Sequence, residues 1–66
     1  MQNRYRRQFI VFRVLEALSN GISSLSVRSD NQDADQEHIR RMFNRKGEDI
    51  RVSKDPDGKR LWFKRK

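Results

Sequence analysis

A chain of 66 residues is long enough for one small domain and too short for a large enzyme. Hydrophobic residues make up 33% of it and charged residues 38%, so any core is small, and without cysteine neither disulfides nor thiolate-bound metals can reinforce that core. The 16 Lys and Arg against 9 Asp and Glu give a net charge of +7, which is typical of proteins that bind nucleic acids.

The first predicted element is a helix over residues 4–19. Its apolar residues recur at the spacing of one helical face, which Phe12 widens. Asn20-Gly21 predicts the end of the helix, because glycine readily takes the left-handed conformation found there. Tyr5 and Phe9 lie off the apolar face and are candidates for a dimer interface. The predicted core residues of this helix are Ile10, Val11, Val14, Leu15 and Leu18.

Two interpretations fit the serine-rich stretch that follows. In one, Ile22 makes an isolated strand contact. In the other, Ser24 caps a short helix that buries Leu25 and Val27, since serine is favoured at helix N-termini.

A second helix is predicted from Asp33, whose side chain can cap the first turn, to the region of Gly47. Gln36 stands where a capping box would place Glu or Gln. Acids near the start and basic residues near the end of this segment suit the helix dipole. The apolar stripe of the helix is Ile39, Met42 and Phe43, and its exposed face carries Glu37, Arg40, Arg41, Asn44 and Arg45.

After Gly47 the period of the sequence changes to two, which predicts a β-hairpin over residues 50–65 with its turn at Asp55-Pro56-Asp57-Gly58. The alternation places four apolar residues on the inner face: Ile50, Val52, Leu61 and Phe63. Trp62 has two possible places. It is either exposed beside basic residues, where it can stack on a base, or packed against the first helix as part of the core.

The order of helix, short element, capped helix and hairpin resembles the winged-helix variant of the helix-turn-helix domain. The closest local match is EHIRRMFNRKGEDIRVSKDPDGKRLWFKR, which resembles a recognition helix, the strand that follows it and a wing. The chain departs from the family in the short, serine-rich segment 23–29 and in the acidic start of the second helix. The resemblance predicts an α+β fold of small winged helix-turn-helix type, with helices followed by a C-terminal β-hairpin wing, as a single domain over residues 1–66 with frayed ends at 1–3 and 65–66.

The resemblance also implies double-stranded DNA as the partner and a role as a small regulator of transcription, replication or recombination. Helix 34–46 would enter the major groove, which admits one helix, and wing 50–64 would contact the backbone. Arg41, Asn44 and Arg45 would face base edges, and Gln36 and Glu37 could approach them. The phosphate contacts expected on this interpretation are Arg40, Lys46, Lys54, Lys59 and Arg60.

Other functions find less support in the sequence. The sequence does not predict an enzyme, because it shows no nucleophile with a base partner, no glycine-rich phosphate loop and no carboxylate pair in an evident pocket. The acids Asp30, Asp33, Asp35 and Glu37 lack the glycine and the final acid of a calcium loop, and His38 is expected on the surface, so neither a metal nor a cofactor is predicted.

Two alternative partners remain. One is a protein, as for a small phage or mobile-element factor that binds host machinery; the other is RNA, for which Tyr5 and Trp62 would matter most. The basic residues Arg4, Arg6 and Arg7 either form an arm along a groove or only flank the helix. A homodimer is possible. The apolar run at residues 9–12 is too short to span a membrane and no signal peptide is visible, so a soluble protein of the cytoplasm is expected, at the nucleoid if it binds DNA.

Overall fold

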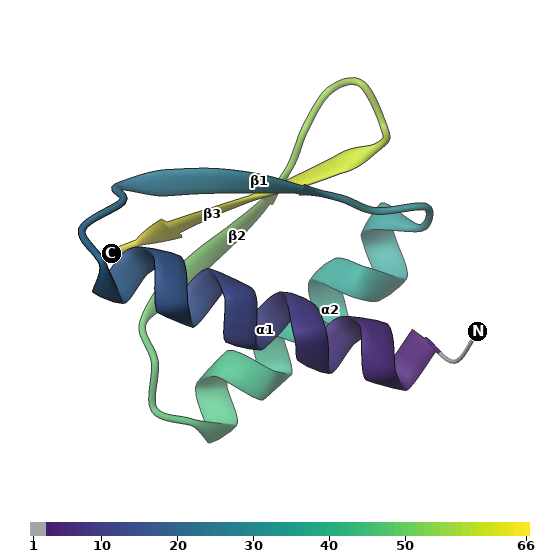
Figure 1. Cartoon of the computed structure of the whole chain (residues 1–66). Coiled ribbons are helices and arrows are strands. Elements are labelled where there is room, and N and C mark those ends of the chain that lie inside the picture. Colours follow the sequence, from purple (N-terminus) through teal and green to yellow (C-terminus); the bar gives the residue numbers. More distant parts are fainter. Residues whose placement is uncertain (1–2) are drawn as a thin grey trace.

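The computed structural model describes residues 3–66 as two layers, with both helices on one face of an antiparallel sheet (Figure 1). The strand order is β1-β3-β2, so the last strand of the chain lies in the middle. The α+β class with a C-terminal hairpin is confirmed, and the arrangement is compatible with a small winged helix. The elements are α1 (Asn3–Ser19), β1 (Ser24–Arg28), α2 (Gln32–Arg45), β2 (Ile50–Lys54) and β3 (Arg60–Arg65).

The apolar face of α1 is the one that the spacing predicts. Ile10, Val11, Val14 and Leu18 are buried, and Leu15 packs against them. The prediction that Phe12 widens this apolar face was wrong, because its side chain is 61% exposed. At about 100° per residue, Phe12 is rotated some 200° from Ile10 and points away from the sheet.

The segment after α1 forms a strand, so the interpretation of a short helix capped by Ser24 was wrong. Strand β1 pairs with β3 over its whole length, with Leu25 opposite Phe63 and Val27 opposite Leu61. The apolar residues alternate with serine, which suits a half-buried strand. Ile22 precedes the strand and is exposed. In the described part of the chain, β1 therefore stands where a helix-turn-helix has its middle helix.

Helix α2 starts earlier than the sequence predicts. Its N-cap is Asn31, whose side chain accepts a hydrogen bond from the Ala34 amide at 3.2 Å. Asp33 is not the cap, and Gln36 does not close a capping box, because its amide donates to Val52 O on β2 at 2.8 Å. Beyond the helix, Gly47 has the expected positive φ of 73°.

The hairpin is confirmed, and its alternation decides the position of Trp62. The four predicted inner residues, Ile50, Val52, Leu61 and Phe63, are all buried. Trp62 therefore faces the opposite side of the sheet and is 40% exposed, so the interpretation that packed it against α1 was wrong.

Hydrogen bonds and ion pairs connect both ends of the described chain to the rest of the fold. Arg7 pairs with Asp35, and Arg6 donates to Arg28 O at 2.7 Å, so these two residues form no extended arm. The side chain of Arg4 and residues 1–2 lie outside the described part. Fraying at 65–66 stays a prediction; in the structure β3 runs to Arg65 and the Lys66 amide donates to Asp49 O at 3.0 Å. Neither α1 nor α2, as far as they are described, is long and apolar enough to cross a membrane.

Candidate nucleic-acid interface

The outward ridge of α2 changes from acidic to basic along the helix. Glu37 accepts from Arg40 at 3.3 Å and from Arg41 at 3.0 Å, so one carboxylate partly neutralises both guanidinium groups. The C-terminal half of the ridge is where the positive charge is available. The predicted contact residues on it, Arg40, Arg41, Asn44 and Arg45, are all exposed.

A groove between α2 and β2 gathers part of this ridge. Arg40 and Asn44 line one wall, and Arg51 and Lys66 line the other. Asp49 is the only acid among the lining residues, and it pairs with Lys66 at 3.3 Å. The groove therefore keeps a positive balance.

Arg51 and Lys64 were missed by the sequence-based assignment. They lie directly opposite each other on β2 and β3, and in the described part of the chain neither has an ion pair with an acid. Together with Arg65 and Lys66 they line a second shallow hollow at the C-terminal end of the sheet. Both residues could have been found from the sequence, because the alternation of the two strands places them on the outward face.

The wing is anchored to the start of α2. The Gln32 amide donates to Asp55 O at 2.9 Å and to Arg60 O at 2.7 Å, and Lys54 pairs with Asp33 at 2.7 Å. These contacts fix the direction of the hairpin relative to the helix. Lys54 is therefore partly neutralised.

Lys59 and Arg60, the other two predicted wing contacts, are exposed. The turn beside them uses its own acids: Asp55 Oδ2 accepts from the Asp57 amide, and Asp57 Oδ1 accepts from the Lys59 amide. Gly58 has a φ of 78°, as the bulged turn requires.

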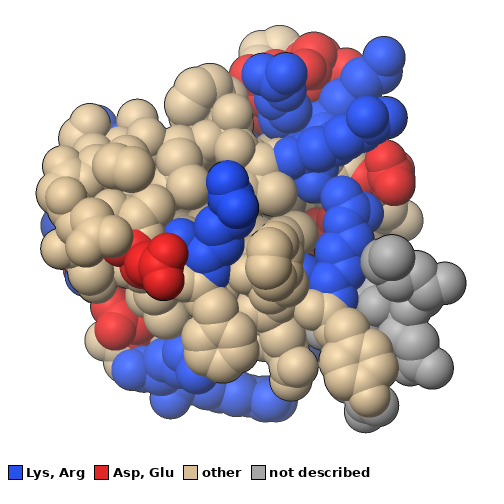
Figure 2. Space-filling model, in the orientation of Figure 1, with Lys and Arg blue, Asp and Glu red and all other residues tan. Residues whose placement is uncertain are grey.

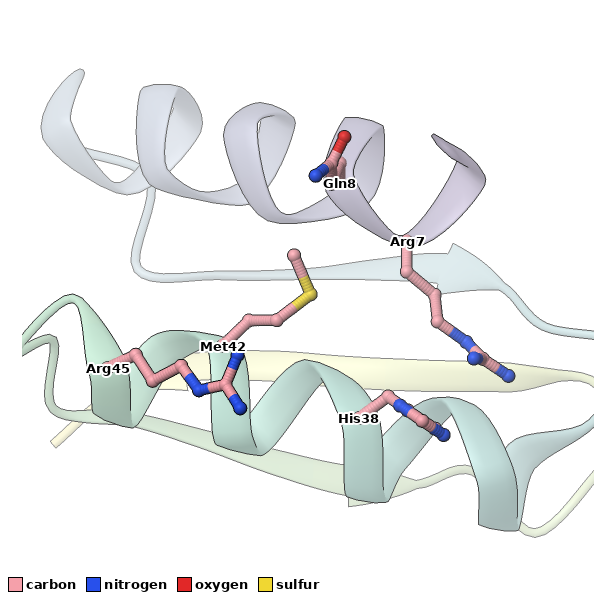
Figure 3. A pocket seen from close by; sticks show the side chains of 5 residues that line it. All are labelled: Arg7, Gln8, His38, Met42 and Arg45. Atoms are coloured by element: carbon pink, nitrogen blue, oxygen red, sulfur yellow. The ribbon is translucent and has the colours of Figure 1, made fainter. Parts of the chain in front are cut away.

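Two of the predicted contacts lie towards α1 instead of the groove. Arg45 lines a pocket between the helices with Arg7, Gln8, His38 and Met42 (Figure 3). Met42 points from α2 towards α1, and Arg7 reaches from α1 towards α2. Lys46 lies 5.2 Å from the ring centre of Phe12, a cation–π contact.

The helix side of the molecule carries most of its basic side chains at its edges. Figure 2 shows Lys and Arg gathered at the upper right and along the lower edge, with basic and acidic atoms also near the centre of an otherwise mostly tan surface. Tyr5, Phe9 and Phe12 are each at least 60% exposed on α1. This aromatic part of α1 is apolar, whereas the groove between α2 and β2 is cationic.

Among the described titratable groups, Asp55 has a clearly shifted pKa. The Trp62 indole donates from Nε1 to Asp55 Oδ1 at 2.8 Å, and this hydrogen bond is the main reason that the pKa of Asp55 is lowered. A hydrogen bond to the charged form favours ionisation. Over residues 3–66 no three His, Cys, Asp or Glu side chains come together in a way that could hold a metal.

Comparisons with protein-family models, with curated proteins and with solved structures give no match for this chain.

Proposed function

We propose that this chain is a double-stranded DNA-binding protein that acts by occupying a site, as a small regulator of transcription, replication or recombination. The observation that carries the proposal is the cationic groove, in which Arg40 and Asn44 of α2 lie beside Arg51 of β2. One surface of this kind offers a side chain for base edges next to side chains for phosphates.

The C-terminal half of α2 would approach the major groove, which is about 12 Å wide and admits a helix. Asn44 is suited to adenine and Arg41 to guanine. Arg40 and Arg51 would bind the flanking phosphates. The N-terminal half would stand further off, because Asp33 and Glu37 repel phosphate.

The wing would supply contacts that carry no sequence information. Gln32 fixes its base against α2, so Lys59 and Arg60 keep a constant offset from the helix. Because this offset is fixed, α2 and the wing can contact the duplex at the same time without a further loss of conformational entropy.

Fluorescence anisotropy of a labelled 20-base-pair random duplex, titrated at two salt concentrations, tests this proposal. We expect binding that weakens steeply with salt, because phosphate contacts release counterions. The variant Arg40→Ala with Asn44→Ala should bind at least tenfold more weakly, since loss of a hydrogen bond between charged groups costs about 1.5–3 kcal/mol and loss of a neutral one about 0.5–1.5 kcal/mol. Arg13→Ala is the matched control, because Arg13 is exposed on α1, outside the groove.

The same titration contradicts the proposal if the wild-type protein fails to bind at low salt. Equal losses for Arg13→Ala and for the groove variant would also contradict it, because the groove would then have no special role.

A protein partner is the second candidate function. The observation in its favour is the row of exposed aromatic residues on α1, Tyr5, Phe9 and Phe12, since exposed apolar patches mark interaction sites. The acids Asp33 and Glu37, which interrupt the basic residues of α2 and the wing, also suit a partner of mixed charge. Loss of DNA binding in the experiment above would favour this candidate.

A further inference from the structure

The face of the sheet that points away from the helices is open and basic. Leu61 and Phe63 are fully buried beneath the helices, so the alternate residues of β3 point outward. This outward face, hereafter the open face, carries four cationic side chains and one aromatic side chain: Arg28, Arg51, Arg60, Lys64 and Trp62.

Trp62 lies in the middle strand between two small residues. It is directly opposite Ser26 on β1 and Ser53 on β2. Serine is too short to cover an indole on the same face of a sheet, so the ring remains 40% exposed. The residue has the largest aromatic surface in the chain and lies where a flat ligand can reach it.

The indole is also held in one orientation. Its Nε1 donates at 2.8 Å to Asp55 Oδ1, on the residue that directly follows the neighbouring strand β2 at the start of the hairpin turn. A ring fixed in this way loses less conformational entropy when a second ring stacks on it. The bond leaves the π-faces of the ring available.

The charges around Trp62 suit a polyanion. Arg60 and Lys64 lie two residues away on the same strand, about 6.6–6.8 Å along it, and Arg51 is opposite Lys64. Asp55 lies at the end of this face, and its ionised carboxylate, which accepts from the indole, also attracts Arg60. Within the described part of the chain, Arg51 and Lys64 have no ion pair with an acid. Arg28 lies opposite Arg60 on β1 and is 3.8 Å from Asp30.

We propose that the open face binds single-stranded nucleic acid, with an unpaired base stacked on Trp62 and the adjacent phosphates bound by Arg60 and Lys64. An aromatic platform within a positive groove is the general arrangement by which proteins hold single strands. Trp62 and Lys64 take no part in the duplex interface proposed above, whereas Arg51 and Arg60 border both surfaces. The proposal therefore does not rest on the duplex interface. Both proposals can hold together for a protein that acts where a duplex is opened.

The intrinsic fluorescence of the protein reports on this site directly, because Trp62 is its only tryptophan. The wild-type protein is titrated with a 12-nucleotide oligothymidine, and in parallel with oligouridine of the same length. We expect saturable quenching of the emission with either strand or with both. The comparison of the two shows whether DNA or RNA is preferred.

A 12-unit abasic oligonucleotide is the matched ligand control, since it has the same phosphates and no bases. We expect it to bind more weakly than oligothymidine and to leave the emission unchanged. A 12-base-pair duplex should also leave the emission unchanged if it docks on α2.

Variants are measured by anisotropy with a labelled oligothymidine. Trp62→Ala should weaken binding by about 5- to 150-fold, the range for the loss of one base stack, and Trp62→Phe should restore part of it. Lys64→Ala should weaken binding and lower the salt slope by about 0.7. Arg13→Ala, at an exposed position of α1 on the helix side, is the control that should change nothing beyond about twofold.

Equal binding of the abasic and the base-carrying strand would overturn the proposal, and so would unchanged emission at saturation. Full affinity in Trp62→Ala would overturn it as well. Because Arg40→Ala with Asn44→Ala leaves the open face intact, loss of duplex binding in that variant with retained oligothymidine binding would separate the two proposals.

Discussion

Arg7 on α1 donates from Nε to Oδ1 of Asp35 on α2 at 2.9 Å, and it does so with a carboxylate that is only 8% exposed. The other oxygen of Asp35 accepts from the buried Ser29 hydroxyl at 2.6 Å. This acid therefore joins α1, α2 and the segment before α2. The group of acids at the start of α2 therefore contains one buried acid that links the two helices.

Asp35→Ala should lower the free energy of unfolding by about 3–5 kcal/mol, because it leaves the Arg7 charge and the Ser29 hydroxyl without their partner. Urea unfolding followed by circular dichroism measures the change. Asp30→Ala is the control: its side chain is 76% exposed, and its pairs with Arg6 and Arg28 are worth at most about 1 kcal/mol. Similar losses for the two variants would mean that the buried position of Asp35 has no special role.

Phe43→Ala should cost about 3–5 kcal/mol, because Phe43 is fully buried and its ring meets the edge of Phe63 at 6.1 Å between centroids. A domain of this size has a total stability of roughly 3–10 kcal/mol, so the variant should be largely unfolded at 37 °C. Phe12→Ala removes an equally large ring from an exposed position and should change stability by less than about 1 kcal/mol. Thermal unfolding of both variants measures the difference, and a larger loss for Phe12→Ala would contradict the assignment of the core.

Trp62→Phe should raise the pKa of Asp55 towards its ordinary value of about 3.9, because the indole hydrogen bond that favours the carboxylate is lost. A pKa that is lower in the folded state contributes stability above the unfolded pKa, and this contribution is lost as the pH falls through the folded pKa. The wild-type protein should therefore lose more stability than the variant as the pH falls from about 5 to below the ordinary carboxyl pKa of about 3.9. Carboxyl chemical shifts measured by NMR over this range give the pKa directly, and an unchanged Asp55 titration would show that the indole bond does not control it.

Glu37→Gln should raise duplex affinity, because Arg40 and Arg41 lose the carboxylate that neutralises them. We expect a gain of about two- to fivefold at low salt, equivalent to ~0.4–1 kcal/mol, and a smaller gain at high salt. Anisotropy with the random duplex measures it. A loss of affinity would instead indicate that Glu37 accepts a hydrogen bond from a cytosine amino group.

Arg41→Ala should change the sequence preference of duplex binding, and Lys59→Ala should change only its overall affinity. Arg41→Ala should relax the preference at one base pair by about 1–3 kcal/mol, whereas Lys59→Ala should weaken all sequences alike and lower the salt slope by about one. A panel of duplex sequences at three salt concentrations distinguishes the two effects. Identical behaviour of both variants would remove the assignment of α2 as the helix that reads bases.

Much of the fold can be predicted from the sequence, because the signals are local. The apolar face around Val11 and Val14 follows from a period of 3.6, and Leu61 and Phe63 follow from a period of two. The ends of both helices could be placed near Gly21 and Gly47, since the left-handed conformation there favours glycine.

Boundaries and short elements were less predictable from local signals. Asn31 and Asp33 can both cap a helix, and the contacts of Asp33 with Lys54 and of Gln36 with Val52 O come from a strand far along the chain. Strand β1 forms because the edge of β3 is there to pair with it. Five residues rich in serine carry too weak a propensity to specify that pairing alone.

The sequence by itself determined the net charge of +7 and the class of the fold, while the face of β3 on which Trp62 lies was settled by the structure. Only the tertiary structure decided which basic residues share a surface, since that depends on which strands and helices become neighbours. Arg40 meets Arg51 across the groove between α2 and β2, while Arg45 is turned towards α1. Charges act through distance in space, and a linear pattern does not contain that distance.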